Sequence, residues 1–490
     1  EKEVIPDRNR LIDRKRFLKE LEEFLGLEFV KSTTATQTTL VVINRARLRD
    51  IAFFMNKNHY QIDGIWASDH NTFFELNYLY SFSPYLSYSP IIIQTQNDKS
   101  VEVASIGDIF NNARYFERNL TNRLGVRFQE VKKPKSGNEN KDESIMFTPF
   151  QITVPSFKRN PLKYGIYHPI HEKNHYFNFF VENGIIRQTE IRDGWVYKKI
   201  QPQLEQRNPI SDYSGLFEQI SANANVHLHL AYYQNLEFLT KKEISNKVKY
   251  IRTLLAELER IKSHLIWFVN FADLLSYNQK AINIYSFFQN LSGVLEKYFL
   301  NSELKNCVKY GSVLDVNMIQ ARHLLKYFID KGNLVFDELY GLVYSSFTEE
   351  KCCGVGRISK ESAQSHGLAG PALRGSGLAI DVRANNPYLI YMTGEISQMW
   401  NVITFQKGDV FARAQVRLWE IRESIEIIKH ILQGLSSYEK GIPSEELPST
   451  IDIEPGKSLF AQVESPQGAL SVYLSRSEEH TSELQSRQVI

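Results

Sequence analysis

The feature that most constrains the fold is a glycine-rich segment at His366–Tyr391, with the sequence HGLAGPALRGSGLAIDVRANNPYLIY. Its glycines lie at positions 367, 370, 375 and 377. Glycine lets the backbone adopt positive φ or approach another surface closely, so this spacing predicts a path of tight turns. Arg374 and Arg383 are permanent cations, and inside a compact segment they need carboxylate partners. On composition alone a structural surface turn is favoured for this segment. The phosphate-loop patterns G-x-G-x-x-G and G-x-x-x-x-G-K-[ST] are absent.

Composition excludes several classes of protein. A length of 490 residues allows two or more domains. With 58 basic and 56 acidic residues, net charge gives no support to nucleic-acid binding or to an anionic membrane surface. Cys307, Cys352 and Cys353 have neither metal-binding spacing nor the pattern of a disulfide framework. Because no signal-peptide region and no membrane-spanning apolar run is visible, we expect a soluble protein of a reducing compartment.

The first part of the chain, residues 1–131, has the pattern of a small α/β domain. Helical spacing occurs at Arg14–Leu25, Leu48–Asn56 and Ile109–Leu120. Strand-like runs occur at Thr39–Ile43, Gln61–Trp66, Phe73–Ser83 and Pro90–Gln94. Residues 132–150 follow, and their polar core KKPKSGNENKDES has no apolar periodicity, which predicts a linker.

The second part, residues 151–475, is predicted to be mainly helical after an initial hairpin. Asn183-Gly184 between two alternating runs is a strong hairpin signal. The clearest helix is Lys247–Leu275, where an apolar stripe leaves Glu257, Glu259, Arg260 and Lys262 on other sides. Further helices are expected at Ala281–Phe299, Asn317–Lys331 and Val410–Leu435. The second of these is expected to end at Gly332, a natural C-cap residue.

The glycine-rich segment resembles the signature G-x-x-GP-x-x-R-x-SG-x-x-x-D-x-R-x-x-x-PY of one superfamily. Its members are the D-type subunits of respiratory complex I and the large subunits of membrane-bound, energy-converting [NiFe] hydrogenases. The matching positions are Gly367, Gly370, Pro371, Arg374, Ser376, Gly377, Asp381, Arg383, Pro387 and Tyr388. In these relatives the segment lies near a buried cavity that holds quinone in one branch and the metal cluster in the other. The resemblance therefore implies a pocket lined by Gly370, Arg374, Ser376, Gly377, Asp381 and Arg383.

Other segments extend the resemblance. Ala113–Phe128 is similar to a helix of the C-type subunits of complex I, although Tyr115 replaces its tryptophan. Arg252–Trp267 is similar to the long helix of the D-type subunits, and Gly408–Ile428 and Val463–Leu474 are similar to a later helix and hairpin. This implies an α+β protein: a small α/β domain of the C type, followed by a mainly helical, hydrogenase-large-subunit-like domain with a small N-terminal β-hairpin region.

The resemblance also implies catalytic residues. In complex I relatives a histidine of the opening hairpin points at the quinone headgroup, and an aspartate after the long helix pairs with it. Here the histidine corresponds to His168 or His171, and Asp273 lies one place before the aspartate. Without the resemblance, an ordinary loop position with a backbone partner is favoured for each histidine. The resemblance predicts that Gly165–His171, Ser221–His229 and the glycine-rich segment converge on one cavity, with Arg374 buried against a carboxylate.

Metal chemistry is not expected in this chain. Hydrogenases carry two cysteines where this chain has Ser221 and Ala224, and neither residue can supply a thiolate. The tyrosine that complex I uses in this stretch corresponds to Ala222. His227 and His229 form an H-x-H pair, but residues two apart on a helix diverge and no third ligand is evident. Hydrogen-bonded polar positions are favoured for this pair, and no nickel–iron cluster is expected.

The resemblance implies a peripheral-arm subunit of a membrane-bound respiratory oxidoreductase, at the cytoplasmic face of the cell membrane. Relatives lie beside a small iron–sulfur subunit, which holds the clusters, and above membrane subunits that translocate ions. They carry no flavin and bind no NADH themselves; quinone is the substrate, and nucleic acid is not a partner. Two alternatives remain open: a redox-silent scaffold subunit, and a hydrogenase that uses other ligands.

The last residues, 476–490, have a different origin in our interpretation. RSEEHTSELQS matches the translation of a widely used sequencing adapter and begins where the family hairpin should continue. We therefore expect the natural chain to be truncated near Ser475 in this sequence, and the short polar tail to pack against nothing.

Overall fold

The computed structural model describes residues 11–26, 30–33, 39–58, 60–82, 91–110, 112–129, 162–164, 176–182, 185–192, 200, 203, 214–221, 224–435, 458–476 and 484–489. The chain forms two compact units, one made of residues 1–131 and 201–490 and the other of residues 132–200. The architecture is mixed α and β, as the sequence predicts. The predicted domain boundaries stay predictions.

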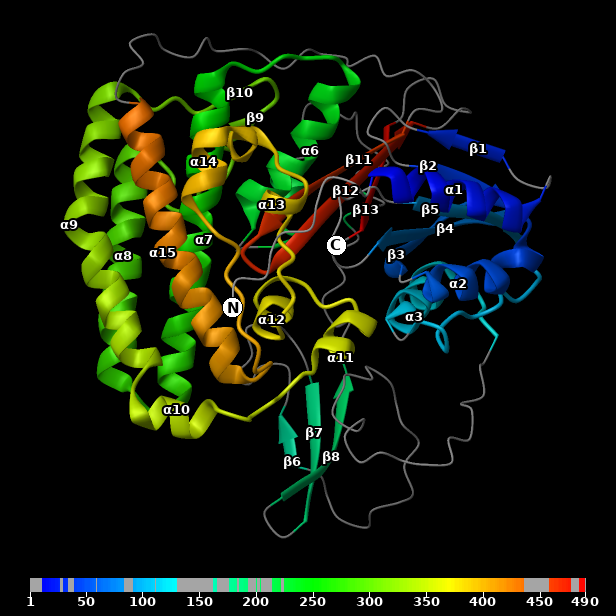
Figure 1. The fold of residues 1–490 in the computed structure, drawn as a ribbon, viewed down its shortest axis with the longest axis horizontal. Helices are drawn as coiled ribbons and strands as arrows, with labels where there is room; N and C mark the ends of the chain where they lie inside the picture. Colours follow the sequence, from blue (N-terminus) through cyan, green and yellow to red (C-terminus); the bar gives the residue numbers. More distant parts are fainter. Residues whose placement is uncertain are drawn as a thin grey trace. The chain divides into compact units, whose positions relative to one another are not determined.

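A five-stranded sheet organises the first 131 residues (Figure 1). Its order is β1 (Val30–Thr33), β2 (Thr39–Ile43), β5 (Ile91–Asp98), β4 (Phe73–Phe82), β3 (Tyr60–Asp69). Only β2 and β5 run parallel; the other neighbours in this sheet are antiparallel. The helices described here are α1 (Leu11–Leu25), the 3-10 helix η2 (Arg45–Arg47), α2 (Leu48–Lys57) and α3 (Ala113–Leu124). Residues of α1, α2 and α3 share one apolar core with the strands, which accounts for the stability of this part.

Four long helices pack side by side in the second half of the chain (Figure 1). They are α7 (Asn246–Leu274), α8 (Asn278–Phe299), α9 (Met318–Val343) and α15 (Val410–Leu435). Helix α7 contacts α8 and α15, and α9 contacts the same two helices. Helix α6 (Asn225–Leu239) packs against α7 and the C-terminal hairpin. The predicted bounds of α15 are confirmed, and α7 begins and ends one residue earlier than the predicted Lys247–Leu275.

The predicted end of the third long helix at Gly332 is wrong. Helix α9 continues through Gly332 to Val343. A Cβ atom on Gly332 would lie 3.1 Å from Cγ2 of Ile425 on α15, so the glycine permits close packing of two helices. Because Gly332 has no side chain, α9 and α15 can pack closely at this position. Gly332 does not form a left-handed helix cap.

Short elements link the long helices. Before α9 lie α5 (Ser214–Phe217), β9 (Val308–Lys309) and β10 (Ser312–Val313). After α9 come α10 (Ser346–Cys352), α11 (Lys360–Ser365), α12 (Gly370–Gly375), α13 (Val382–Asn385), the 3-10 helix η4 (Leu389–Met392) and α14 (Gly394–Met399). The glycine-rich segment thus runs from the end of α11 to η4, and positive φ at Gly367, Gly370 and Gly377 confirms its predicted turns.

The C-terminal hairpin consists of β11 (Ser458–Ser465) and β12 (Gly468–Arg476), as expected. The prediction that the tail packs against nothing is wrong, because β13 (Leu484–Val489) pairs antiparallel with β12. The outer edge of β12 presents backbone N–H and C=O groups, and such an edge pairs with any extended segment regardless of its side chains. The adapter origin of residues 476–490 stays a prediction.

The second compact unit contains a three-stranded antiparallel sheet of β6 (Leu162–Tyr164), β7 (Tyr176–Glu182) and β8 (Ile185–Arg192). Strands β7 and β8 flank Asn183-Gly184 and pair with each other, which confirms the predicted hairpin. The predicted linker 132–150 and the loop Gly165–His171 lie outside the described residues.

Among the helices of the described ranges, none has both the length and the apolar composition to cross a bilayer.

Candidate functional site

The glycine-rich segment is held against the C-terminal hairpin by backbone contact. Gly370 has φ +59°, and a Cβ atom there would lie 2.1 Å from the carbonyl oxygen of Gln467. Gly377 has φ +89°, and its Cβ would lie 2.3 Å from Oε1 of Gln406. Ser376 donates from Oγ to the carbonyl oxygen of Ala372 at 3.0 Å. These close approaches fix α12 and so fix the direction of the Arg374 side chain.

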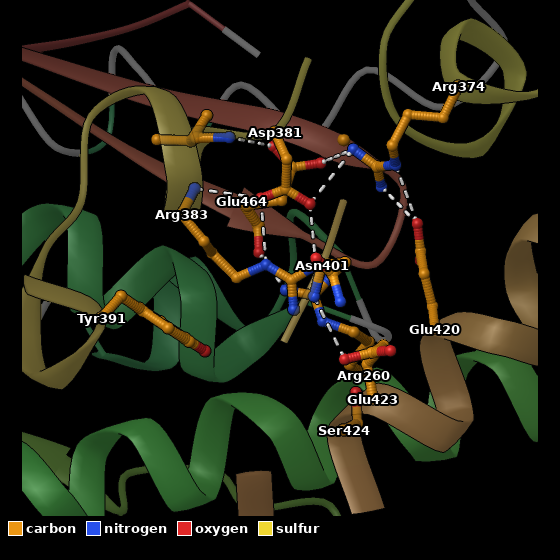
Figure 2. Close-up of polar contacts among 12 residues, drawn as sticks. Arg260, Arg374, Asp381, Arg383, Tyr391, Asn401, Glu420, Glu423, Ser424 and Glu464 are labelled. Carbon is orange, nitrogen blue, oxygen red and sulfur yellow. Dashed lines mark hydrogen bonds and ion pairs between the residues drawn. The ribbon is translucent and has the colours of Figure 1, made fainter. Parts of the chain in front are cut away.

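Arg374 is completely buried and is surrounded by three carboxylates (Figure 2). Its Nε donates to Oε1 of Glu420 at 2.8 Å, and its Nη1 donates to Oε1 of Glu464 at 2.7 Å. The same Nη1 lies 3.4 Å from Oδ2 of Asp381. The prediction of a buried, carboxylate-paired Arg374 is therefore confirmed.

Arg383 extends this set of contacts toward α7. Its Nε and Nη2 donate to the two carboxylate oxygens of Asp381 at 3.0 and 2.7 Å, a two-pronged geometry that arginine favours. Its Nη1 donates to Oε1 of Glu257 at 3.0 Å. The guanidinium carbon also lies 4.5 Å from the ring centre of Trp400, which adds a cation–π contact.

Glu257 and Arg260 come from adjacent turns of α7. Arg260 donates from Nε to Oε2 of Glu257 at 3.2 Å, and Ser424 donates to the same oxygen at 2.6 Å. Tyr391 donates to the other oxygen, Oε1. Burial alone would raise the pKa of Glu257, but Arg260 and Arg383 outweigh it and lower that pKa to about 2. Glu257 is therefore ionised at neutral pH.

His264 joins the same cluster from α7. Its Nε2 lies 2.8 Å from Oε2 of Glu420. Burial lowers the pKa of His264 to about 4, so the ring is neutral at pH 7 and donates its Nε2 proton to Glu420. For Glu420, Arg374 and His264 outweigh burial and hold its pKa well below the usual range. We call the residues Glu257, Arg260, Arg374, Asp381, Arg383, Glu420 and Glu464, all at most 3% exposed, the buried ion network.

A second polar group lies at the first turns of α6. Asn225, His227 and His229, which we call the α6 cluster, are at most 1% exposed. Among the described residues, both polar atoms of the Asn225 side chain and the Nε2 atoms of both histidines have no hydrogen-bond partner. Buried polar atoms are almost always paired, so four such atoms within two turns of one helix point to a missing ligand or water.

The histidines of the α6 cluster are held from their other ring nitrogen. Nδ1 of His227 lies 2.6 Å from Oε2 of Glu259, whose carboxylate also accepts from the backbone N–H groups of Val226 and His227. Nδ1 of His229 lies 2.7 Å from the carbonyl oxygen of Asn225. The prediction of fully hydrogen-bonded histidines is therefore wrong for Nε2 within the described residues, because these partners reach only one side of each ring.

Comparison with known proteins identifies the relationship. The family model described as "Respiratory-chain NADH dehydrogenase, 49 Kd subunit" matches residues 306–487. The NADH-quinone oxidoreductase D subunit of Geobacter metallireducens is 29% identical over 338 residues, covering 60% of this chain and 82% of the relative. The fused C/D subunit of the same enzyme in Phocaeicola vulgatus is 24% identical over 425 residues, covering 78% of each chain. The F(420)H(2) dehydrogenase D subunit of Methanosarcina mazei is 26% identical, covering 63% of this chain and 82% of the relative.

The chain is similar to members of the complex I/hydrogenase-related family. The resemblance inferred from the glycine-rich segment is thereby confirmed. A solved structure shares the fold: that of the membrane-bound sulfane sulfur reductase, an archaeal respiratory membrane complex. The TM-score is 0.56 at 20% identity, over 68% of this chain and 90% of that chain.

The predicted site residues of this complex I-related chain have different positions in the structure. Arg374, Asp381 and Arg383 lie together in the buried ion network, and Gly370, Ser376 and Gly377 support it. Asp273 lies exposed in the last turn of α7. His168 and His171 lie outside the described residues. Their predicted convergence with the α6 cluster therefore stays a prediction.

Sequence reasoning missed four members of the network: Glu257, Arg260, Glu420 and Glu464. Glu257, Glu259 and Arg260 were expected on the sides of the long helix away from its apolar stripe, yet all three are buried. The reason is that α7 is enclosed by α6, α8, α15, β10 and η4, so its polar sides also lie inside the protein. The sequence did contain a signal for their burial: these charged residues lie at neighbouring positions of a helix that has apolar residues on every side.

Proposed function

We propose that this chain is a peripheral-arm subunit of a membrane-bound respiratory oxidoreductase complex and forms the pocket that binds a quinone-type acceptor. The similarity to this family and the names of the relatives, subunits of NADH-quinone oxidoreductase and F(420)H(2) dehydrogenase, support this function. In this proposal a small iron–sulfur subunit passes electrons to the pocket. Membrane subunits of the same complex couple the reduction to ion translocation, and this chain lies at the cytoplasmic face of the cell membrane.

The α6 cluster is the observation that carries the pocket proposal. It lies in the stretch Ser221–His229 that the family resemblance assigns to the cavity wall. Asn225 offers a buried donor and a buried acceptor that have no partner among the described residues, and His229 offers a ring nitrogen in the same state. Phe217 lies beside His229, with ring centres 5.5 Å apart in an edge-to-face arrangement. An aromatic wall with a few convergent polar atoms is typical of sites for small ring-shaped ligands.

The chemistry of these atoms suits both redox states of a quinone. A quinone carbonyl accepts a hydrogen bond, which the Nδ2 group of Asn225 can donate. A quinol hydroxyl donates one, which Oδ1 of Asn225 or Nε2 of His229 can accept. Burial lowers the pKa of His229, so its ring is neutral and, with Nδ1–H bound to the Asn225 carbonyl, Nε2 carries a lone pair. Asn225 and His229, four residues apart, share one face of α6.

In this proposal His168 or His171 contacts the second oxygen of the headgroup and supplies a proton to it. Asp273 stabilises the imidazolium form of that histidine, as a nearby carboxylate does. Asp273 is exposed in the described part of the chain.

A nickel–iron cluster has no part in this proposal. Ser221 and Ala224 occupy the positions where hydrogenases have cysteines. Cys307 lies outside this stretch and is buried. Burial raises the pKa of its thiol to about 12, which disfavours the thiolate form that binds metals. Cys352 and Cys353 are adjacent at the end of α10 and cannot reproduce a C-x-x-C pair.

Replacing Asn225 by leucine tests whether the α6 cluster binds the acceptor. The change removes two buried polar atoms that lack partners, so we expect the ligand-free chain to gain about 1–3 kcal/mol in the free energy of unfolding. The same change removes a hydrogen bond to the headgroup, so we expect KM for a short-chain quinone to rise roughly three- to tenfold in the assembled complex. Denaturant unfolding of the chain and steady-state quinone reduction measure the two effects.

Asn235→Leu is the matched control on the same helix. Asn235 is equally buried, but its Nδ2 donates to the carbonyl oxygen of Val472 at 2.8 Å. We therefore expect this variant to lose stability and to keep the wild-type KM. A loss of stability with an unchanged KM in Asn225→Leu as well would mean that Asn225 has only a structural role.

A further inference from the structure

The buried ion network holds more acidic groups than basic ones. Its basic members are Arg260, Arg374 and Arg383, and its acidic members are Glu257, Asp381, Glu420 and Glu464. All seven are at most 3% exposed, and His264 beside them is neutral. With every carboxyl ionised, the network would carry one negative charge in excess. An uncompensated buried charge is costly, and a protein avoids it by keeping one group neutral.

Two of the four carboxylates, those of Glu257 and Asp381, accept hydrogen bonds from several strong donors. Glu257 accepts from two arginines, a serine hydroxyl and a tyrosine hydroxyl. Asp381 accepts two hydrogen bonds from the guanidinium of Arg383 and one from the Arg383 backbone N–H. It also lies 3.4 Å from Nη1 of Arg374. Such numbers of donors stabilise the ionised form of a carboxyl group.

Both carboxylate oxygens of Glu420 also contact side-chain donors, whereas Glu464 contacts only one side-chain donor and one backbone donor. Oε1 of Glu420 lies 2.8 and 2.7 Å from two nitrogens of Arg374, and Oε2 accepts from neutral His264. Glu464 accepts one hydrogen bond from Nη1 of Arg374 at 2.7 Å and one from the backbone N–H of Val382 at 3.0 Å. Moreover, the Nη1 group that contacts Glu464 also lies 3.4 Å from Oδ2 of Asp381, so two carboxyl groups face the same guanidinium nitrogen (Figure 2).

We propose that Glu464 is a proton-binding site and that its carboxyl group is neutral in the folded protein at neutral pH. The groups beside it are Arg374 from α12, Asp381 at α13, and Arg260 from α7, which donates to the Glu464 backbone carbonyl. The Tyr388 hydroxyl accepts from the Glu464 backbone N–H, and Glu420 from α15 shares Arg374 with Glu464. With Glu464 neutral, three guanidinium groups face three carboxylates. Burial, followed by the charge of Asp381, raises the pKa of Glu464, in agreement with this assignment.

The proton makes folding depend on pH in a definite direction. A carboxyl group whose pKa is raised on folding binds more protons in the folded than in the unfolded state. Its stabilising contribution is full below its unfolded pKa, about 4.5, and is lost as pH rises toward the folded value. This proton-binding site is independent of the proposed quinone pocket, since it rests on the ion network alone.

Glu464→Gln and Glu420→Gln test the proposal as a matched pair. Glutamine mimics a neutral carboxyl and takes up no proton on folding, so we expect Glu464→Gln in the full chain to keep or raise Tm at pH 7. Glu420→Gln removes a real negative charge beside Arg374, so we expect Tm to fall by roughly 5 °C or more, or the chain to fail to fold. We also expect the decrease in Tm with rising pH to be smaller in Glu464→Gln than in wild type.

Infrared spectroscopy gives a readout that does not depend on stability. A protonated carboxylic acid has a C=O stretching band separate from those of carboxylates. We expect the wild-type chain at pH 7 to show such a band from Glu464 that exchanges slowly in D2O, and Glu464→Gln to lose that intensity. A Glu464→Gln variant that keeps this band and loses as much Tm as Glu420→Gln would overturn the proposal.

Discussion

Replacing Arg374 by methionine is expected to lower the free energy of unfolding by at least about 3–5 kcal/mol, because it leaves buried carboxylates without their cation. The guanidinium is completely buried and contacts Glu420, Glu464 and Asp381. Methionine fills a similar volume, so the loss measures charge and hydrogen bonding rather than a cavity. Denaturant unfolding of the full chain at pH 7 provides the measurement.

Arg422→Met is the control for this substitution. Arg422 lies on α15, is 37% exposed in its side chain, and makes a 3.7 Å contact with Glu426. Exposed ion pairs contribute about 0–1 kcal/mol, so we expect this variant to unfold nearly as wild type does. Equal small losses in both variants would show that the buried ion network does not support the fold.

The second large effect is expected for Gly370→Ala, with a loss of about 3 kcal/mol or more in the free energy of unfolding. The new Cβ atom would lie 2.1 Å from the carbonyl oxygen of Gln467, and φ at this position is +59°. Either α12 or the turn between β11 and β12 must move, which separates Arg374 from Glu464. Thermal and denaturant unfolding will report the loss.

Gly125→Ala isolates the contribution of backbone conformation. Gly125 ends α3 with φ +72°, yet no atom of the described residues lies within 4 Å of its Cβ position. We expect this variant to lose only about 1 kcal/mol, the ordinary cost of a left-handed residue with a side chain. If Gly370→Ala loses no more than Gly125→Ala, the contact between α12 and the hairpin is not tight in solution.

The helices were the most predictable part of the fold. Val410–Leu435 was predicted from its spacing and matches α15 at both ends, because its apolar residues pack against α7 and α9. Gly332 misled the prediction since a glycine for a helix end and a glycine for a helix contact look alike in sequence. The difference lies in Ile425, a residue from another helix.

The candidate site was predictable only in part. The need of Arg374 for a carboxylate follows from its charge, but its partners Glu420 and Glu464 lie 46 and 90 residues away in sequence. Their proximity depends on how α15 and β11 pack, which no local pattern encodes. Likewise, which ring nitrogen of His227 has a partner depends on Glu259 of a different helix. The pairing of β13 was missed for a related reason, since a sheet edge recognises backbone rather than side chains.

Quinone reduction by the assembled complex, with His168→Ala and His171→Ala compared singly, tests whether this chain forms an acceptor pocket. We expect one of the two variants to lose turnover by roughly 100-fold or more, because it removes the proton donor to the headgroup. The other variant should keep near wild-type turnover and serves as the internal control, with copurification of the partner subunits verified for both. Unchanged turnover in both variants would contradict the proposed acceptor pocket.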